Sequence, residues 1–492
     1  MTKSSTWTAL QNRAFRRLWI ATVISGTCEA AHYSAATWMM NVLTGSPFLI
    51  SLMATVASLP YFLFTLPAGV LADKVNRQKF VCGINLWLAA MAAGLAVFGW
   101  LHLLNPYTIL ASVFLIGVGF AFNAPAWTSI VPQVVSDGEL PSAATLSGLQ
   151  LNISGIIGPA LGGFLIPLAG SNSVFAVNAA CFLLVVLAIR QWKQPIAPTK
   201  LPSESFFKSF GTVIRYVRYV PRLQVVLARN FLFALFISVI PALMPVVGLQ
   251  VLHLGSSQLG LLFTSMGAGS VIGAVFVISR LRARFSPDSV TLSANLLIAL
   301  AYLLMALVRQ AEVFFVVAAL AGVGWTLSAS ELWVAAQRAM PSWARGRVNA
   351  TVIMISQGAM AFGGLVWSSA AAVAGPIHAL LGASVLFLVS LLLAGRLSIN
   401  VRADPEQKVL GFLSRSVESG EGTPIALTSH VYLLSMAAAY LNQTFTGRIP
   451  PASPVSKSPM LSGIEGKRVK ITGRIEMYKE KPEIRINAGR TA

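Results

Sequence analysis

Three side chains able to carry or relay a proton lie together in the first long apolar stretch of the sequence. Glu29, His32 and Tyr33 stand at positions i, i+3 and i+4, which share one face of a helix. An acid inside a membrane helix is costly, and apolar surroundings favour its protonated form. Such a carboxyl takes up a proton from one side and releases it when its cavity is hydrated from the other. The spacing predicts a proton-coupling site; the alternative is a carboxyl hydrogen-bonded for helix packing.

The second apolar stretch ends with a glycine that is followed by charged residues. These residues are Gly69, Asp73, Arg77 and Lys79. The glycine would let this helix approach a neighbour closely, and the acid would meet the positive N-terminus of a helix across an interface. The segment resembles the loop signature of the major facilitator superfamily, which implies a conformational gating role. An ordinary basic loop is the alternative. Asn76 stands where the family has a second glycine, and asparagine tolerates positive φ.

A second glycine motif falls in the fifth apolar stretch, where the sequence reads GIIGPALGG. Small residues at this spacing permit close helix contact, and the proline removes a backbone hydrogen bond and kinks the helix. The run is similar to the Gly-Pro-x-x-Gly-Gly motif of antiporter and exporter branches of the same superfamily. A generic glycine-rich interface is the alternative. The motif residues are Gly155, Gly158, Pro159, Gly162 and Gly163.

Other polar and aromatic residues inside the apolar stretches are weaker candidates. Glu331 lies close in sequence to Arg338, and charges inside membranes pair, so a structural ion pair is predicted. Six residues are possible lining for a cavity, although each alone is more commonly a packing or lipid-facing residue. They are Asn123, Gln150, Asn152, Trp38, Trp127 and Trp325.

These residues are positioned by about twelve apolar stretches, each long enough to cross a bilayer as a helix. The longest connection, at 190–223, divides them six and six and carries a basic amphipathic segment predicted to lie on the membrane surface. This is the plan of a secondary transporter: an all-α membrane protein with two six-helix halves. The predicted helices span 15–40, 48–72, 80–103, 107–131, 143–168, 172–190, 224–248, 257–279, 288–308, 313–336, 348–371 and 377–395.

Charge sets the predicted orientation. Only 11% of residues are charged, yet the formal net charge is +20. All but one of the Lys and Arg residues before residue 396 fall in the N-terminal arm or in alternate loops; the exception is Arg309. Basic loops stay in the cytoplasm, so both termini are predicted to be cytoplasmic, and the basic pI requires no nucleic-acid partner.

The sequence contains no phosphate-binding loop of the Gly-x-x-x-x-Gly-Lys-(Ser/Thr) type, which argues against an ATP-driven pump within this chain. We expect no enzyme activity, no cofactor and no metal site. The three cysteines, Cys28, Cys82 and Cys181, all lie in apolar stretches, and we interpret them as packing residues rather than disulfide partners.

The last hundred residues differ in character. Residues 397–441 read as a linker or tail. Alternating apolar residues over 467–478 and 483–487 predict a β-hairpin, which makes the C-terminal tail β-rich. Residues 442–492 resemble the last strands of an OB-fold, a domain type that binds single-stranded nucleic acid. The first strands of such a barrel are absent, so we expect an accessory fold with no nucleic-acid role.

A narrower resemblance covers roughly residues 10–395. The segments LTGSP at 43–47, LPAG at 66–69, AAQRAMP at 335–341 and RGRV at 345–348 resemble the bacterial branch called transmembrane secretion effectors. Many members of that branch have arginine where this chain has Ser154.

This resemblance implies a proton-coupled exporter of siderophores or drug-like molecules in the bacterial inner membrane. The chain would be a monomer that works by alternating access, with a small molecule, protons and the bilayer as partners. The two halves would comprise residues 1–190 and 224–396, joined by the linker at 191–223. The alternative is a membrane-anchored binding or signalling protein that acts through its OB-like tail.

Overall fold

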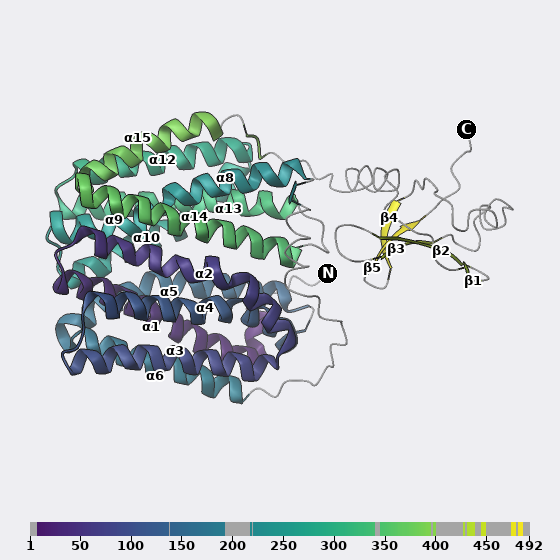
Figure 1. Ribbon diagram of the computed structural model, residues 1–492, viewed down its shortest axis with the longest axis horizontal. Coiled ribbons are helices and arrows are strands. Elements are labelled where there is room, and N and C mark those ends of the chain that lie inside the picture. The colour runs from purple at the N-terminus through teal and green to yellow at the C-terminus, as the bar shows by residue number, and fades with distance from the viewer. Residues whose placement is uncertain are drawn as a thin grey trace. The chain divides into compact units, whose positions relative to one another are not determined.

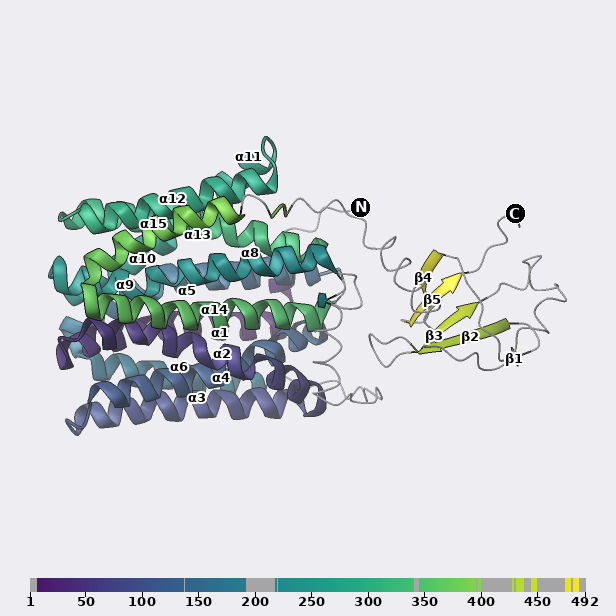
Figure 2. The same cartoon turned by 45° about the horizontal axis from the view of Figure 1, so that its top comes forward.

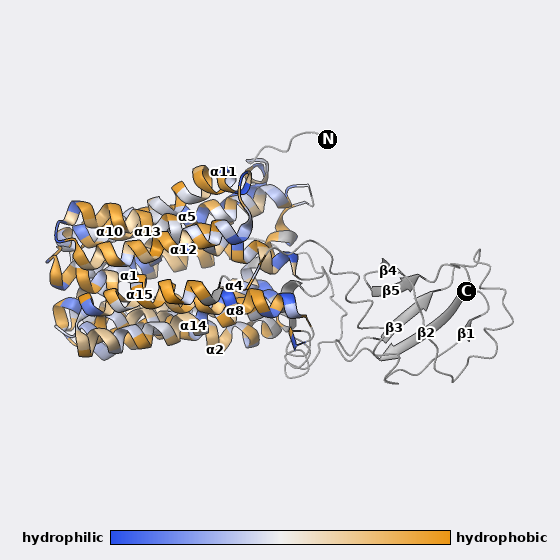
Figure 3. Ribbon diagram, turned by 90° about the horizontal axis from the view of Figure 1, so that it is seen from above, coloured by the Kyte–Doolittle hydropathy of each residue, from blue (hydrophilic) through white to orange (hydrophobic). Residues whose placement is uncertain are grey.

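Long apolar helices packed side by side dominate the computed structural model (Figure 1). The structure describes residues 7–136, 138–191, 217–218, 220–339, 345–394 and 397–399, together with five short strands. Hydrophobic residues cover most of the length of the helices, as Figure 3 shows, which suits a surface facing lipid. In Figures 1 and 2 the purple-to-blue helices of the first half and the teal-to-green helices of the second form two adjoining groups.

The helices of the first half begin at clear capping signals. Asn12 accepts hydrogen bonds from the backbone N–H groups of Ala14 and Phe15, and Ser46, Asn76 and Asn105 cap the next three helices in the same way. A 3₁₀ turn at Thr8–Gln11 precedes α1. The helices are α1 (Arg13–Leu43), α2 (Pro47–Lys74), α3 (Arg77–Trp100), α4 (Pro106–Val134), α5 (Leu140–Ala169) and α6 (Ser171–Arg190).

Two helices of the second half are interrupted. The expected span at 224–248 is formed by α8, α9 and a π-helical turn, and Pro245 lies inside α9. The next span contains a π-helical turn that starts at Gly273; such turns interrupt the regular hydrogen bonding of a helix. The elements are α8 (Pro221–Ile237), α9 (Val239–Val246), η2 (Val247–Val251), α10 (Ser256–Ile272), η3 (Gly273–Val277), α11 (Ile278–Arg282), α12 (Pro287–Leu307), α13 (Ala311–Arg338), α14 (Arg345–Ala374) and α15 (Pro376–Ala394).

Ten helical segments in the described ranges are long and apolar enough to cross a membrane, rather than the expected twelve. The other two expected spans form helices that fall short of that standard. α1 carries three arginines near its start and Glu29 near its middle, which lower its hydropathy. The apolar part of α15 is short, covering Pro376–Leu392. The structure thus shows a multi-pass, nearly all-helical protein.

Helices that are distant in sequence supply the packing around the candidate site. In the first half, α1 packs against α5 and α6, α2 against α4, and α3 against α4 and α6. α5 also packs along α10, which belongs to the second half. One apolar cluster, which includes Ala35, Met40 and Phe175, joins α1 and α6 with neighbouring helices. The core therefore fixes α1 between two helices of its own half.

The remaining elements are five strands in the second of two compact units of the chain. They form one sheet in the order β1-β2-β3-β5-β4, in which only β3 and β5 are parallel. β4 and β5 pair within the segment where the sequence predicts a hairpin. The predicted amphipathic segment of the linker lies outside the described residues. The strands are β1 (Leu427–Thr428), β2 (Val431–Ala437), β3 (Thr444–Arg448), β4 (Arg474–Tyr478) and β5 (Lys481–Arg485).

Candidate transport site

The interface between α1 and α6 carries buried polar groups. The half-buried Glu29 accepts a hydrogen bond from the Asn178 side-chain amide at 3.0 Å, and Asn178 itself is fully buried. One residue earlier on α1, the thiol of Cys28 lies 2.8 Å from that of Cys181, and both cysteines are free. Asn178 and Cys181 are three residues apart, so they share one face of α6 and meet the matching face of α1.

His32 continues this interface by one further turn. Its ring lies 4.7 Å from the ring of Phe175, and the residue is 1% exposed. Neither ring nitrogen has a hydrogen-bond partner among the described residues. A buried polar group without a partner is costly, so this imidazole is held by packing in a place where a polar ligand or water would stabilise it.

Tyr33 points elsewhere. Its ring lies 6.5 Å from the ring of Phe263 on α10, so it faces the second half of the protein. The three residues predicted to form one proton-coupling site are therefore divided. Glu29 and His32 face α6, and Tyr33 faces the interface between the two halves. Asn178 is the partner that sequence reasoning missed; a lone amide in an apolar stretch was the available signal.

The glycine motif of α5 has two faces, and the first packs against α1. A side chain at Gly158 would place its Cβ 2.5 Å from the carbonyl oxygen of Thr27. At Gly162 the Cβ would lie 2.6 Å from the carbonyl oxygen of Ala31. Real Cβ atoms do not come so close to backbone, so only glycine permits this approach of α1 and α5. This contact lies within the first half.

The second face of the motif packs against α10 of the second half. A Cβ at Gly163 would lie 2.7 Å from the carbonyl oxygen of Ser256. One at Gly267 of α10 would lie 2.8 Å from the carbonyl oxygen of Gly155. A Cβ at Gly155 itself would meet nothing within 4 Å. The two helices thus approach backbone to backbone over at least two turns.

Hydrogen bonds support the same contact. Ser257 donates to the carbonyl of Gly163 at 3.2 Å, and Thr264 donates to the carbonyl of Ile156 at 2.7 Å. Near the end of α1, the Gln250 side-chain amide donates to the carbonyl of Gly45 at 3.1 Å. These contacts between the halves run from the end of the bundle where α1 ends and α10 begins to about the middle of α5, and that end is opposite to the end with the basic loops.

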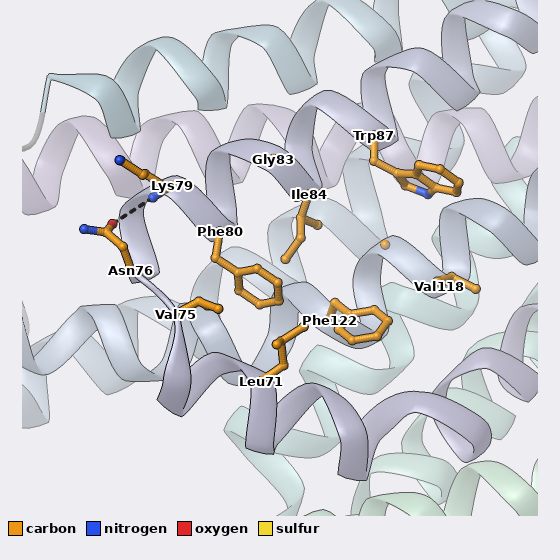
Figure 4. Close-up of a pocket in the computed structure, with 11 residues that line it drawn as sticks. Leu71, Val75, Asn76, Lys79, Phe80, Gly83, Ile84, Trp87, Val118 and Phe122 are labelled. Carbon is orange, nitrogen blue, oxygen red and sulfur yellow. Dashed lines mark hydrogen bonds between the residues drawn. The ribbon is translucent and has the colours of Figure 1, made fainter. Parts of the chain in front are cut away.

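The segment between α2 and α3 differs in one way from its predicted form. Among the described residues a Cβ at Gly69 would meet nothing within 4 Å, so the close helix approach expected at this glycine is not made in this state and stays a prediction for the other state. Asn76 has φ −63°, and its side chain accepts from the backbone N–H of Lys79 at 3.0 Å (Figure 4). Asn76 is therefore the N-cap of α3 rather than a residue with positive φ. Asp73 lies in the last turn of α2, and its side chain is outside the described residues. Arg77 begins α3.

Glu331 is buried and forms an ion pair, but with Arg282 of α11 at 2.6 Å in place of the predicted Arg338. The turn at the end of α11 brings Arg282 alongside α13, whereas Arg338 is exposed two turns further along the same helix. A second ion pair, Arg229 with Asp288, was not predicted. Asp288 also accepts from the backbone N–H of residue 399, beyond α15.

The six possible cavity residues do not form one cluster. Gln150 donates to Ser154 at 3.3 Å, and Asn152 is exposed and bonds the Gly148 carbonyl of its own helix. Trp38 and Trp127 contact different apolar clusters. The other two are half-buried on separate helices: Asn123 on α4 and Trp325 on α13. Ser154 is buried against α1.

A family model described as transmembrane secretion effector matches residues 4–413. The chain belongs to this family of the major facilitator superfamily. The resemblance to transmembrane secretion effectors, inferred from the segments LTGSP, LPAG, AAQRAMP and RGRV, is thereby confirmed.

Named relatives of this secretion effector are exporters. Macrolide efflux protein A of Streptococcus pyogenes is 22% identical over 265 residues, which cover 54% of this chain and 65% of that protein. An enterobactin exporter of Citrobacter koseri is 25% identical over 267 residues, which cover 53% of this chain and 62% of that protein. The chain thus matches less than two thirds of the length of either relative.

Solved structures show the same fold. The TM-score is 0.64 with a mutant of the nucleoside transporter NupG, which is 13% identical, over 77% of this chain and 99% of that one. It is 0.63 with an inward-facing, occupied bacterial homologue of the human lysosomal transporter Spinster, at 13% identity, over 80% and 99%. The proteins named in these comparisons are transporters, not enzymes.

Proposed function

We propose that this secretion effector is a proton-coupled exporter of small molecules that works by alternating access. The observation that carries the proposal is the α5–α10 contact, in which glycines and backbone carbonyls of the two halves meet from one end of the bundle to about the middle of α5. The closest approaches there are of glycine to backbone, so we expect the halves to separate without repacking a core. α1 and α15 complete the proposed set of twelve spans.

The basic residues give the proposed orientation. Arg17, Lys79, Arg282 and Arg338 lie at the end of the bundle opposite to the α5–α10 contact. Because basic loops stay in the cytoplasm, that end faces inward, and both termini are cytoplasmic. In this proposal the contact between the halves closes the outer side, and the state described is inward-open. Asp73, Arg77 and Lys79 would stabilise the opposite state, in which the inner ends of the halves meet.

Proton coupling is assigned to Glu29. Its carboxylate has one described hydrogen-bond donor, Asn178, and no cation among the described residues pairs with it. Among the described residues an amide is thus the one donor to this anion, and we expect protonation to be accessible during the cycle. His32 lies on the same interface and supplies an unpartnered polar group nearby. The rival role for Glu29, a purely structural hydrogen bond to α6, predicts no link to transport.

The substrate class rests on the relatives. Macrolides and enterobactin are both large, partly polar molecules, so a siderophore or a drug-like compound is the proposed cargo. The test is accumulation of a macrolide and of a catechol siderophore in cells with and without the gene. We expect lower accumulation with the gene, and loss of that difference when a protonophore collapses the proton gradient. Unchanged accumulation of both compounds would remove the export proposal, and export that survives the protonophore would remove the coupling.

A further inference from the structure

A groove lies on the first half between α2, α3 and α4, apart from the proposed transport site (Figure 4). Its volume is about 630 Å³. Figure 4 shows aromatic and aliphatic side chains from all three helices around one space. They include Leu71, Val75, Phe80, Ile84, Trp87 and Phe122.

One end of the groove is polar and the rest is apolar. Lys79 and Asn76 lie at the polar end, and both are exposed. The indole N–H of Trp87, at the other end, is already bonded to the carbonyl of Leu115 at 2.9 Å. The indole therefore offers the groove its apolar ring surface rather than a donor. From Lys79 to Trp87 the helix rises about 12 Å, because each residue adds about 1.5 Å.

We propose that this groove binds an anionic phospholipid of the leaflet next to Lys79. The headgroup phosphate meets the Lys79 ammonium, and about 12 Å of one acyl chain lies along α3 as far as Trp87. Two observations select this occupant. Lys79 lies in the first turn of α3, the end of the helix that the proposed orientation places at the headgroups, and the body of the groove is apolar on three helices. Leu71 and Trp87 are both exposed, so the groove is reachable from the bilayer without crossing the protein core.

Gly83 makes the proposal testable, because it lines the groove and a Cβ there would meet nothing within 4 Å. Gly83→Leu should fill the groove without displacing a neighbour. Gly94 offers a matched control on the same helix, since its Cβ would also meet nothing within 4 Å and it does not line the groove. Lys79→Gln tests the charge, with Arg284→Gln as an exposed cation control on the second half.

The experiment is native mass spectrometry of the full-length protein titrated with phosphatidylglycerol or phosphatidylcholine. We expect Gly83→Leu to weaken retention of both lipids about tenfold, as if two methylene groups were no longer buried. Lys79→Gln should reduce the preference for phosphatidylglycerol about fivefold and leave phosphatidylcholine unchanged. Gly94→Leu and Arg284→Gln should match the wild type. Equal retention by Gly83→Leu and Gly94→Leu, or an unchanged lipid preference in Lys79→Gln, would overturn the proposal. So would displacement of the lipid by a macrolide, which would identify the groove as a substrate site.

Discussion

Two adjacent glycines of α5 should respond to the same substitution in opposite ways. Gly162 faces α1 within one half, and Gly163 faces α10 across the two halves. A Cβ at Gly162 would lie 2.6 Å from backbone, and one at Gly163 would lie 2.7 Å from backbone. Ordinary contact begins near 3.4 Å, so both alanines require similar shifts of their neighbours. Overpacking of this kind costs about 1–3 kcal/mol.

The difference lies in whether that cost can be relieved. In the proposed cycle α1 and α5 belong to the same half and stay together, so Gly162→Ala should lower the free energy of unfolding by about 1–3 kcal/mol. α5 and α10 separate when the outer side opens. Gly163→Ala should therefore shift the balance from the inward-open toward the outward-open state by about 5- to 150-fold. Gly155→Ala is the control, because its Cβ meets nothing and only helix propensity changes, by about 1 kcal/mol.

Thermal unfolding measures the first effect, and pulsed electron paramagnetic resonance measures the second. Spin labels at Val42 and Val373, both exposed near the end of the bundle where the halves meet, report their separation. We expect Gly163→Ala to populate longer distances with a melting temperature close to that of Gly155→Ala. We expect Gly162→Ala to melt earlier with unchanged distances. Equal loss of stability in both variants, with no change in either distance distribution, would refute the assignment of the two faces.

Three further predictions follow from individual contacts. Arg282→Ala leaves the buried carboxylate of Glu331 unpaired, so it should lower the free energy of unfolding, measured by thermal unfolding, by about 1–3 kcal/mol. Adding Glu331→Gln should restore most of this stability. No recovery in the double variant would contradict the pairing. Mild oxidation should join Cys28 to Cys181 by a disulfide, since their thiols lie 2.8 Å apart, and peptide mass spectrometry would detect the cross-link. The Cys82→Ser variant should still form it. An intact Cys28 thiol after oxidation would argue against the α1–α6 register. Removal of residues 402–492 should leave export in cells intact at equal membrane levels; loss of export would favour the alternative function through the tail.

The sequence alone predicts the apolar spans, because a bilayer imposes a length and a composition on each helix. Both glycine motifs are visible in the sequence from their residue spacing. Which face of a helix meets which neighbour is not encoded locally. Glu29 and Asn178 are 149 residues apart, and periodicity cannot pair them. The same limit explains Glu331, whose partner comes from α11 rather than from its own sequence neighbourhood.

A prediction from residue type is also ambiguous where one residue type suits two kinds of backbone position. Asparagine is common both at positions with positive φ and at helix N-caps. In the structure Asn76 is the N-cap of α3. Gly69 has the spacing of a contact glycine, and in this state a Cβ there would meet nothing within 4 Å among the described residues, so its role in the other state stays a prediction. The gating role of Asp73 and Arg77 stays a prediction, because it concerns the state in which the inner ends meet.

The most direct test of the account is proton-driven transport by Glu29→Gln in proteoliposomes. The matched control is Glu312→Gln, an exposed acid in the first turn of α13. With an imposed pH gradient, we expect Glu312→Gln and the wild type to concentrate the substrate equally. Glu29→Gln should bind the substrate but fail to concentrate it, and its binding should lose its dependence on pH. Normal uphill transport by Glu29→Gln would contradict the account and reduce Glu29 to a packing residue between α1 and α6.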